Sequence, residues 1–192
     1  RQDENVGTTA VREGFRFDEG SLARWMEAQV EGYAGPLSVE QFKGGQSNPT
    51  YRLSTPRRSY VLRRKPPGPL RPTAHAIDRE FRVLSALDGT GVPVPAPHLY
   101  CSDTEVIGSE FYIVDAVEGP IFWSSELPGV TPEYRRGYYT DLFRQLAKLH
   151  AVDWQAAGLG DYGKNTGFTA RNLERWYKTF CDTKAIEIPD ID

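Results

Sequence analysis

The sequence predicts an α+β protein in which a sheet lobe with one inserted helix leads into a mainly α-helical lobe. Several segments of strand length, among them residues 60–65 and 111–117, alternate in character or carry a continuous apolar run. One helical pattern over residues 76–87 lies between these strands, and a long amphipathic pattern begins after residue 131. Strands with one inserted helix, followed by helices, are typical of this architecture.

The first elements follow from local patterns near the N-terminus. Residues 1–14 are mostly small and polar, which predicts a flexible segment. Asp18 can cap a helix over Ser21–Val30, whose apolar residues recur on one side. Two short strands, Leu37–Lys43 and Thr50–Ser54, are predicted on either side of a glycine-rich segment.

Prolines and caps mark the later elements. Four prolines and a glycine predict a loop over residues 65–72, and prolines around residues 92–97 predict a connector. Thr131 followed by Pro132 is an N-cap with a first-turn proline, which predicts the start of the long helix. A further helix is predicted over Leu173–Phe180.

Composition and charge exclude several classes of protein. Of the 192 residues, 39% are hydrophobic and 26% are charged, which is ordinary for a globular protein. The net charge of −3 gives no electrostatic basis for binding nucleic acid. No apolar run approaches the length of a membrane span and no signal peptide pattern opens the chain, so we expect a cytoplasmic protein without a membrane partner. Cys101 and Cys181 are expected to be reduced thiols.

The glycine-rich segment between the first strands is a candidate for binding a phosphate. Glycines let backbone N–H groups approach a phosphate closely, and serine and asparagine side chains can add donors. The candidate residues are Gly44, Gly45, Gln46, Ser47 and Asn48. An ordinary hairpin turn explains the same composition. The segment is not a Walker loop, because no Gly-Lys-Ser or Gly-Lys-Thr follows at the required spacing.

A cation and a carboxylate follow this segment. Arg63 should share a strand face with Val61, so that an apolar contact and a cation point into one space, as a nucleotide requires. Glu80 lies at the margin of the apolar stripe of its helix, and Arg63 is its natural partner because an unpaired carboxylate near a core is costly. Arg64 should face the opposite way. Solvated charges on an edge strand and a helix margin are the alternatives.

The apolar strand over residues 111–117 includes a possible contact for a base. Asp115, Ala116 and Val117 come where this strand ends, and their backbone groups could meet the edge of an adenine ring. Viewed alone, the same residues are simply the end of a strand.

Other polar residues are not assigned to a site. Gly160–Asn165 loosely follows a kinase catalytic loop, but its asparagine comes four residues after Asp161 instead of five. An ordinary loop is therefore expected there. His75 and His98 have no convergent partners in the sequence that would indicate a metal site or a nucleophile.

Taken together, these segments resemble the aminoglycoside phosphotransferase and choline kinase family over nearly the whole chain. The order and spacing of five runs carry the resemblance: Phe42–Tyr51, Tyr60–Arg63, Ile77–Phe81, Phe111–Gly119 and Leu146–His150. The Ser-Asn-Pro of the glycine-rich segment, the Arg-Arg-Lys-Pro-Pro-Gly run and Tyr100–Asp103 are similar to one subgroup. Its members are phosphotransferases found alone or fused to acyl-CoA dehydrogenases.

The resemblance implies a protein-kinase-like fold whose first lobe is an antiparallel sheet with one inserted helix. Gly44–Asn48 would cover the phosphates of ATP, and Arg63 would stand where many kinases have lysine. Glu80 would hold Arg63, and Asp115–Val117 would form the hinge that grips adenine. Arginine departs from the kinase pattern, because a guanidinium makes a forked contact where an ammonium acts as a point charge.

The resemblance also implies what this chain lacks. The His-Gly-Asp loop of the family, its asparagine and a later metal-binding aspartate have no match here. The expected lobes are therefore 15–118 and an incomplete 119–192, with the Mg²⁺ ligands beyond residue 192 and no activity in this chain alone. The full-length protein would transfer the γ-phosphoryl group of ATP to a small-molecule hydroxyl, of a hydroxyacyl-CoA type more than an aminoglycoside. The alternative is a pseudokinase-like nucleotide-binding or scaffold module that partners an acyl-CoA dehydrogenase.

Overall fold

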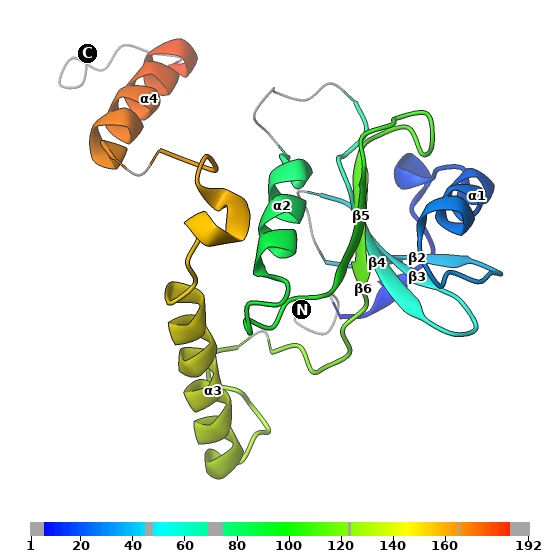
Figure 1. The fold of residues 1–192 in the computed structure, drawn as a ribbon, viewed down its shortest axis with the longest axis horizontal. Helices are drawn as coiled ribbons and strands as arrows, with labels where there is room; N and C mark the ends of the chain where they lie inside the picture. The colour runs from blue at the N-terminus through cyan, green and yellow to red at the C-terminus, as the bar shows by residue number, and fades with distance from the viewer. Residues whose placement is uncertain (1–5, 45–47, 69–74, 123, 165, 185–192) are drawn as a thin grey trace. The chain divides into compact units, whose positions relative to one another are not determined.

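The computed structural model contains two compact units, residues 1–152 and 153–192, which are described separately. The first unit is built on an antiparallel sheet, and the second contains one long helix (Figure 1). The structure describes residues 6–44, 48–68, 75–122, 124–164 and 166–184.

The sheet of the first unit has six strands, and every neighbouring pair is antiparallel. Their order across the sheet is β1-β2-β3-β4-β6-β5, so β3 and β4 lie at its centre and β6 lies beside the edge strand β5. The strands are β1 (Thr8–Thr9), β2 (Ser38–Phe42), β3 (Thr50–Ser54), β4 (Ser59–Arg64), β5 (Pro97–Cys101) and β6 (Phe111–Asp115).

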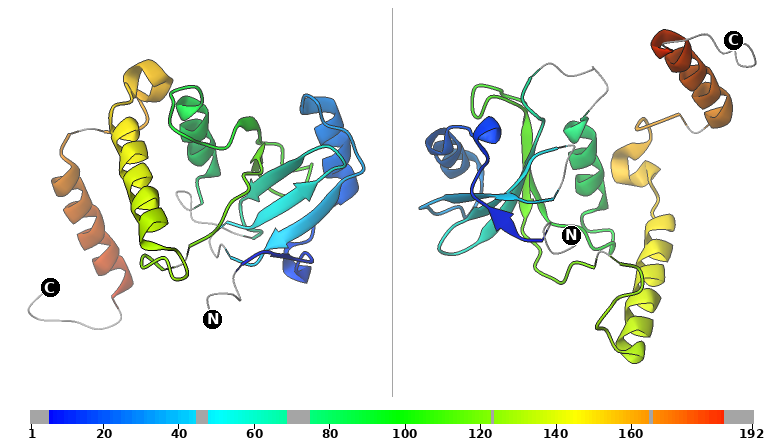
Figure 2. Two further views of the ribbon diagram at one scale, coloured as in Figure 1. Left: turned by 90° about the horizontal axis from the view of Figure 1, so that it is seen from below. Right: turned by 180° about the vertical axis from the view of Figure 1, so that it is seen from behind.

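Two helices of the first unit cover opposite faces of the sheet, as the views from three sides agree (Figures 1 and 2). These helices are α1 (Glu19–Gln29) and α2 (Ile77–Leu87), and the unit ends with the long helix α3 (Pro132–His150). The second unit begins with a short π-helical segment, Gln155–Leu159, and continues into α4 (Phe168–Thr183). The predicted α+β architecture is therefore confirmed, with α2 as the helix predicted between the strands.

The predicted caps explain where two of the helices begin. The carboxylate of Asp18 accepts a hydrogen bond from the backbone N–H of Ser21 at 2.9 Å, which satisfies a free donor of the first turn of α1. Thr131 caps α3 in the same way, and Pro132 fits the first turn because no N–H is required there. Both helix starts are confirmed.

Two strands lie where the sequence does not predict them. β5 begins at a proline and its register against β6 shifts between Pro97 and Leu99, so it shows no regular alternation. β1 pairs Thr8 with Phe42 of β2, within the stretch for which the sequence predicts a flexible segment. Residues 1–5 of that stretch lie outside the described residues. Neither strand has the apolar period of two that makes a strand visible in a sequence.

The core has two parts, one on each face of the sheet. The larger part lies between the sheet and α1 and includes Leu22, Met26, Tyr51, Leu53, Tyr60, Leu62, Phe111 and Ile113. The smaller part lies against α2 and is formed by Ile77, Tyr112 and Val114. The face toward α1 is therefore the main source of hydrophobic stabilisation.

The long helices carry exposed apolar side chains. On α3 the stripe predicted from the sequence includes Leu142, Phe143 and Leu146, which are 57%, 64% and 42% exposed. On α4, Leu173 and Trp176 are likewise exposed. Within the described residues, no helix combines the length and apolar character that crossing a bilayer requires.

The two cysteines are free thiols in different environments. Cys101 at the end of β5 is buried, and burial raises the pKa of its thiol. Cys181 lies on α4 and is exposed.

Glu110, just before β6, is a carboxylate whose charge stabilises the sheet. The Nζ atom of Lys65 lies 2.8 Å from one of its oxygens, and the hydroxyl of Tyr100 donates to the same oxygen. These hydrogen bonds, that of Lys65 first, hold the pKa of the Glu110 carboxyl below its ordinary value of 4.5. The charged form is thus favoured by folding.

We expect the contribution of Glu110 to depend on pH. A carboxyl whose pKa is lowered in the folded state contributes stability above its unfolded-state pKa, and this is lost as the pH falls through the folded-state pKa. Glu110→Gln should therefore lower the free energy of unfolding by about 0.5–1 kcal/mol at neutral pH. The gap from wild type should narrow below about pH 4.5. Urea unfolding at several pH values measures this gap, with Glu126→Gln as the exposed control. A constant gap would contradict the expectation.

Candidate functional site

Successive side chains of β4 point alternately to the two faces of the sheet. Leu62 and Arg64 are buried on the face toward α1, whereas Val61 and Arg63 lie on the face toward α2. The Nε atom of Arg63 lies 2.7 Å from the Oε2 atom of Glu80 on α2, as an ion pair without the alignment of a hydrogen bond. The two residues that the sequence pairs are thus in contact.

Glu80 receives two further donors. The hydroxyl of Tyr112, on β6, donates to Oε2 at 3.1 Å, and the side-chain amide of Asn48 donates to Oε1 at 3.2 Å. Burial, followed by the charge of Glu80, raises the pKa of the Tyr112 hydroxyl, so this group remains a proton donor. The carboxylate is therefore held by Arg63, Tyr112 and Asn48, which come from three separate parts of the chain.

Asn48, at the end of the glycine-rich segment, is only 3% exposed. Its Oδ1 atom lies 2.7 Å from Nδ1 of His75, and its backbone carbonyl accepts a hydrogen bond from the hydroxyl of Thr50. The sequence predicts the Asn48 side chain as a possible phosphate donor, whereas here both ends of its amide contact protein groups. Of the other predicted residues in this segment, Gly44 is described, while Gly45, Gln46 and Ser47 lie outside the described residues.

The three residues predicted to meet a base lie where β6 ends. The N–H of Asp115 donates to Ala96 at 2.9 Å, and the N–H of Ala116 donates to Ser59 at 3.1 Å. Val117 is 72% exposed, and among the described residues its N–H meets no acceptor. Of these three, Val117 is therefore the residue whose N–H is open to a ligand.

The side chain of Asp115 belongs to the other face of the sheet. Asp115 is the register partner of Tyr60, a residue of the larger core. Its Oδ1 atom lies 2.8 Å from Nε2 of His98 and 3.7 Å from Nε of Arg58. Any role of Asp115 toward a ligand on the α2 face would therefore depend on its backbone.

Sequence reasoning missed the partners of both histidines. His75 precedes α2 and meets Asn48, and His98 of β5 meets Asp115. The residues of these pairs are 27 and 17 positions apart, so only the fold brings them together. A prediction of β5 as a strand paired with β6 would have revealed the second pair, because neighbouring strands align their side chains.

Arg64 lies on the far face and is 3% exposed. Its Nε atom donates to the hydroxyl of Ser109 at 2.8 Å, and its guanidinium lies 5.5 Å from the ring centre of Phe17. Burial lowers the pKa of this guanidinium, as expected for a charge removed from water. The two neighbouring arginines of β4 thus occupy different environments, and only Arg63 is on the face of Glu80.

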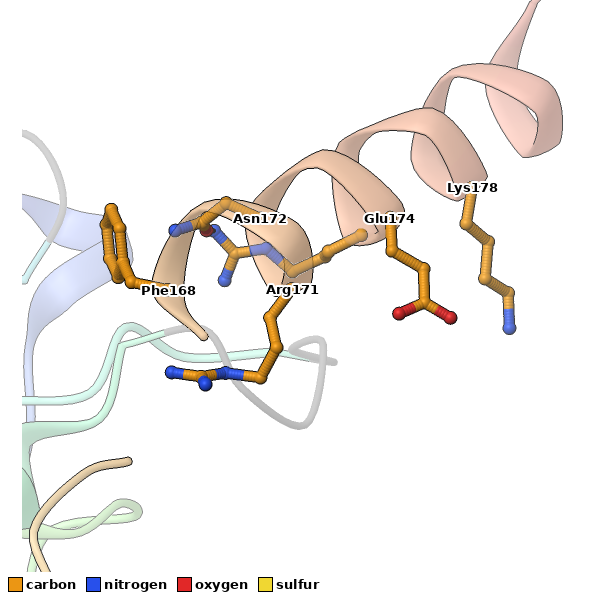
Figure 3. A pocket seen from close by; sticks show the side chains of 6 residues that line it. Phe168, Arg171, Asn172, Glu174 and Lys178 are labelled. Carbon is orange, nitrogen blue, oxygen red and sulfur yellow. Dashed lines mark hydrogen bonds between the residues drawn. The ribbon is translucent and has the colours of Figure 1, made fainter. Parts of the chain in front are cut away.

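A separate hollow of about 580 Å³ lies along α4 in the second unit (Figure 3). Six side chains of this one helix line it: Phe168, Arg171, Asn172, Glu174, Arg175 and Lys178. Sequence reasoning assigned it no role, although Arg171, Arg175 and Lys178 recur at the spacing of one helical face. Nearby, residues 160–164 form turns and bends, as predicted for an ordinary loop.

Comparison with known proteins identifies the family of this chain. The chain matches the model of a phosphotransferase enzyme family over residues 38–192. A crystal structure of a putative aminoglycoside phosphotransferase from Ralstonia eutropha is 48% identical and superposes with a TM-score of 0.75, covering 91% of this chain and 50% of that one.

Similar curated proteins are named after another enzyme. Acyl-CoA dehydrogenase family member 11 of Gallus gallus is 44% identical over 187 residues, covering 95% of this chain and 24% of the relative. A probable acyl-CoA dehydrogenase of Arabidopsis thaliana is 42% identical, with 90% and 22% covered. The chain thus spans about a quarter of the length of these relatives. The family match over most of its residues shows that the chain belongs to the phosphotransferase enzyme family.

Proposed function

We propose that the full-length protein is an ATP-dependent phosphotransferase that transfers the γ-phosphoryl group to a small-molecule hydroxyl. One observation carries this proposal: Arg63 and Glu80 form an ion pair on the same face of β4 as Val61, close to the end of the glycine-rich segment. Phosphoryl transfer depends on positioning and on stabilising charge, and a cation held by a fixed carboxylate provides both.

The described residues fit a nucleotide on this face. Arg63 keeps two terminal nitrogens besides the Nε that faces Glu80, and its Nη1 already donates to Thr50 at 3.3 Å. Its guanidinium can therefore contact a phosphate while it stays paired with Glu80. Val61 supplies apolar surface, and the N–H of Val117, which meets no acceptor among the described residues, can donate to a ring nitrogen of adenine. ATP, when bound, supplies the phosphoryl group.

In this proposal the residues described above bind only the nucleotide, and other residues of the full-length protein bind the acceptor and the metal. Among the described residues, no three histidine, cysteine, aspartate or glutamate side chains group as metal ligands. We propose that Mg²⁺ is held by residues beyond position 192. The names of the relatives favour an acceptor of the hydroxyacyl-CoA type, and an acyl-CoA dehydrogenase as a fused or separate partner.

A second candidate function is a non-catalytic nucleotide sensor or scaffold, similar to a pseudokinase. The arginine at position 63 favours it, because this residue departs from the lysine of many kinases. As a sensor the full-length protein binds ATP but phosphorylates no hydroxylated acceptor, and as a scaffold it does neither. As a phosphotransferase it binds ATP and also phosphorylates a hydroxylated acceptor.

Calorimetry of Mg-ATP binding to the full-length protein tests the shared part of these proposals. Val117→Pro removes this N–H, and we expect it to weaken binding about tenfold, the scale of leaving one acceptor unpaired. Val117→Ala keeps the N–H and should bind as wild type does. If proline and alanine have equal effects, this N–H does not contact the nucleotide. A wild-type protein that binds no Mg-ATP would overturn the phosphotransferase and the nucleotide sensor, and would favour the scaffold.

A further inference from the structure

We propose that Asn48 is a positioning residue that fixes Glu80, and through it Arg63, and is not itself a phosphate ligand. The proposal rests on the proposed function for its effect on ATP, but its structural part can be tested without any nucleotide. Asn48 directly follows a glycine-rich segment, where an asparagine is easily taken for a ligand. Its contacts in the fold point to a different role.

The two partners of Asn48 determine the orientation of its amide. A carboxylate oxygen can only accept a hydrogen bond, so the Asn48 atom that faces Glu80 at 3.2 Å is Nδ2. The Oδ1 atom therefore faces His75, whose Nδ1 must carry the proton of the 2.7 Å contact. The amide oxygen and one amide proton are thus engaged within the protein. With 3% of the residue exposed, little surface remains for a ligand.

The conformation of His75 supports a specific contact. Its φ angle is +60°, in the left-handed region that residues with a Cβ atom seldom adopt. Such a conformation persists only where the surroundings hold it. The contact with Asn48 and the hydrogen bond from the N–H of Ile77 to the His75 carbonyl both act at this residue. The start of α2 is therefore tied to Asn48 by its side chain.

The backbone beside Asn48 is tied to Arg63 as well. The carbonyl of Asn48 accepts from the Thr50 hydroxyl, and this hydroxyl accepts from Nη1 of Arg63. Asn48 is consequently linked to both members of the ion pair, to Glu80 by a direct hydrogen bond and to Arg63 by two hydrogen bonds that meet at the Thr50 hydroxyl. A change of the Asn48 side chain should displace the carboxylate and, with it, the guanidinium that faces the proposed phosphates.

An exchange of the amide and the carboxylate tests this role. Asn48→Asp alone places two carboxylates in contact, and Glu80→Gln alone removes the partner of Arg63. The double variant again has one carboxylate and one amide in the pair, with their positions exchanged. We expect the urea midpoint of the double variant to be higher than the value obtained by adding the midpoint shifts of the two single variants. Additive shifts would show that the side chains do not interact, and would overturn the proposal.

Mg-ATP affinity distinguishes positioning from direct binding. Each single variant should bind about tenfold more weakly, and the double variant no more weakly than either single one. If Asn48 bound a phosphate directly, the losses of Mg-ATP affinity in the two single variants would multiply, to about 100-fold in the double variant. This result would contradict the proposal even if the shifts of the urea midpoint were not additive. Asn172→Asp makes the same change of side chain on α4. Its effects on the urea midpoint and on the Mg-ATP affinity should add to those of Glu80→Gln. If the wild-type protein binds no ATP, the proposed function fails. The urea midpoints still show whether the side chains of Asn48 and Glu80 interact.

Discussion

An Arg63→Ala variant of the full-length protein is expected to bind Mg-ATP about 5- to 150-fold more weakly than wild type. This range corresponds to about 1–3 kcal/mol, the scale for losing a hydrogen bond to a charged group. The Arg63 side chain is 30% exposed and its guanidinium lies against Glu80, so this group is held in place before any nucleotide binds. Its removal takes away a preformed donor and leaves the carboxylate of Glu80 without its cation. Calorimetry with Mg-ATP measures the change in affinity.

Two further variants make this prediction specific. Arg63→Lys keeps the charge but loses the fork, so its affinity should lie between those of wild type and Arg63→Ala. Arg57→Ala removes an exposed arginine from the turn between β3 and β4 and should leave the affinity unchanged. An Arg63→Ala variant that binds as tightly as wild type would place the nucleotide elsewhere.

The largest loss of stability is expected from Phe111→Ala, which should lower the free energy of unfolding by about 3–5 kcal/mol. Phe111 is fully buried at the start of β6, and its ring meets that of Trp25 edge-on at 5.0 Å. The substitution removes this contact and leaves a cavity between the sheet and α1. Urea unfolding, followed by the fluorescence of tryptophan, measures the loss.

Phe143→Ala provides the matched control. Phe143 on α3 is 64% exposed, so the same change of side chain should cost less than about 1 kcal/mol. If both variants were equally stable, the larger core would not lie on the α1 face of the sheet.

Much of this fold could be predicted from the sequence because its signals are local. The alternation of β4, the apolar run of β6 and the caps of α1 and α3 each depend on residues within a few positions of one another. β1 and β5 lack such signals, since their pairing is set by neighbouring strands and, in β5, by a register shift. The resemblance to the phosphotransferase family, carried by the order of five runs, is confirmed.

The candidate site shows a sharper limit. The contact of Arg63 with Glu80 follows from strand alternation and from the need to pair a charge, and both can be seen in the sequence. The contacts of Asn48 cannot be seen there, because their partners His75 and Glu80 lie 27 and 32 positions later in the sequence and only the fold brings them to Asn48. An asparagine beside glycines has the same pattern whether it contacts a ligand or a neighbouring helix. Only its burial separates the two cases.

The different environments of the two cysteines bear on how the protein can be observed. A thiol reacts through its thiolate, so the buried Cys101, with its raised pKa, is protected against alkylating reagents. Cys181 is exposed on α4, in the other compact unit. On this chain a maleimide dye would therefore attach at Cys181, and its fluorescence would report on the second unit without any engineered attachment point.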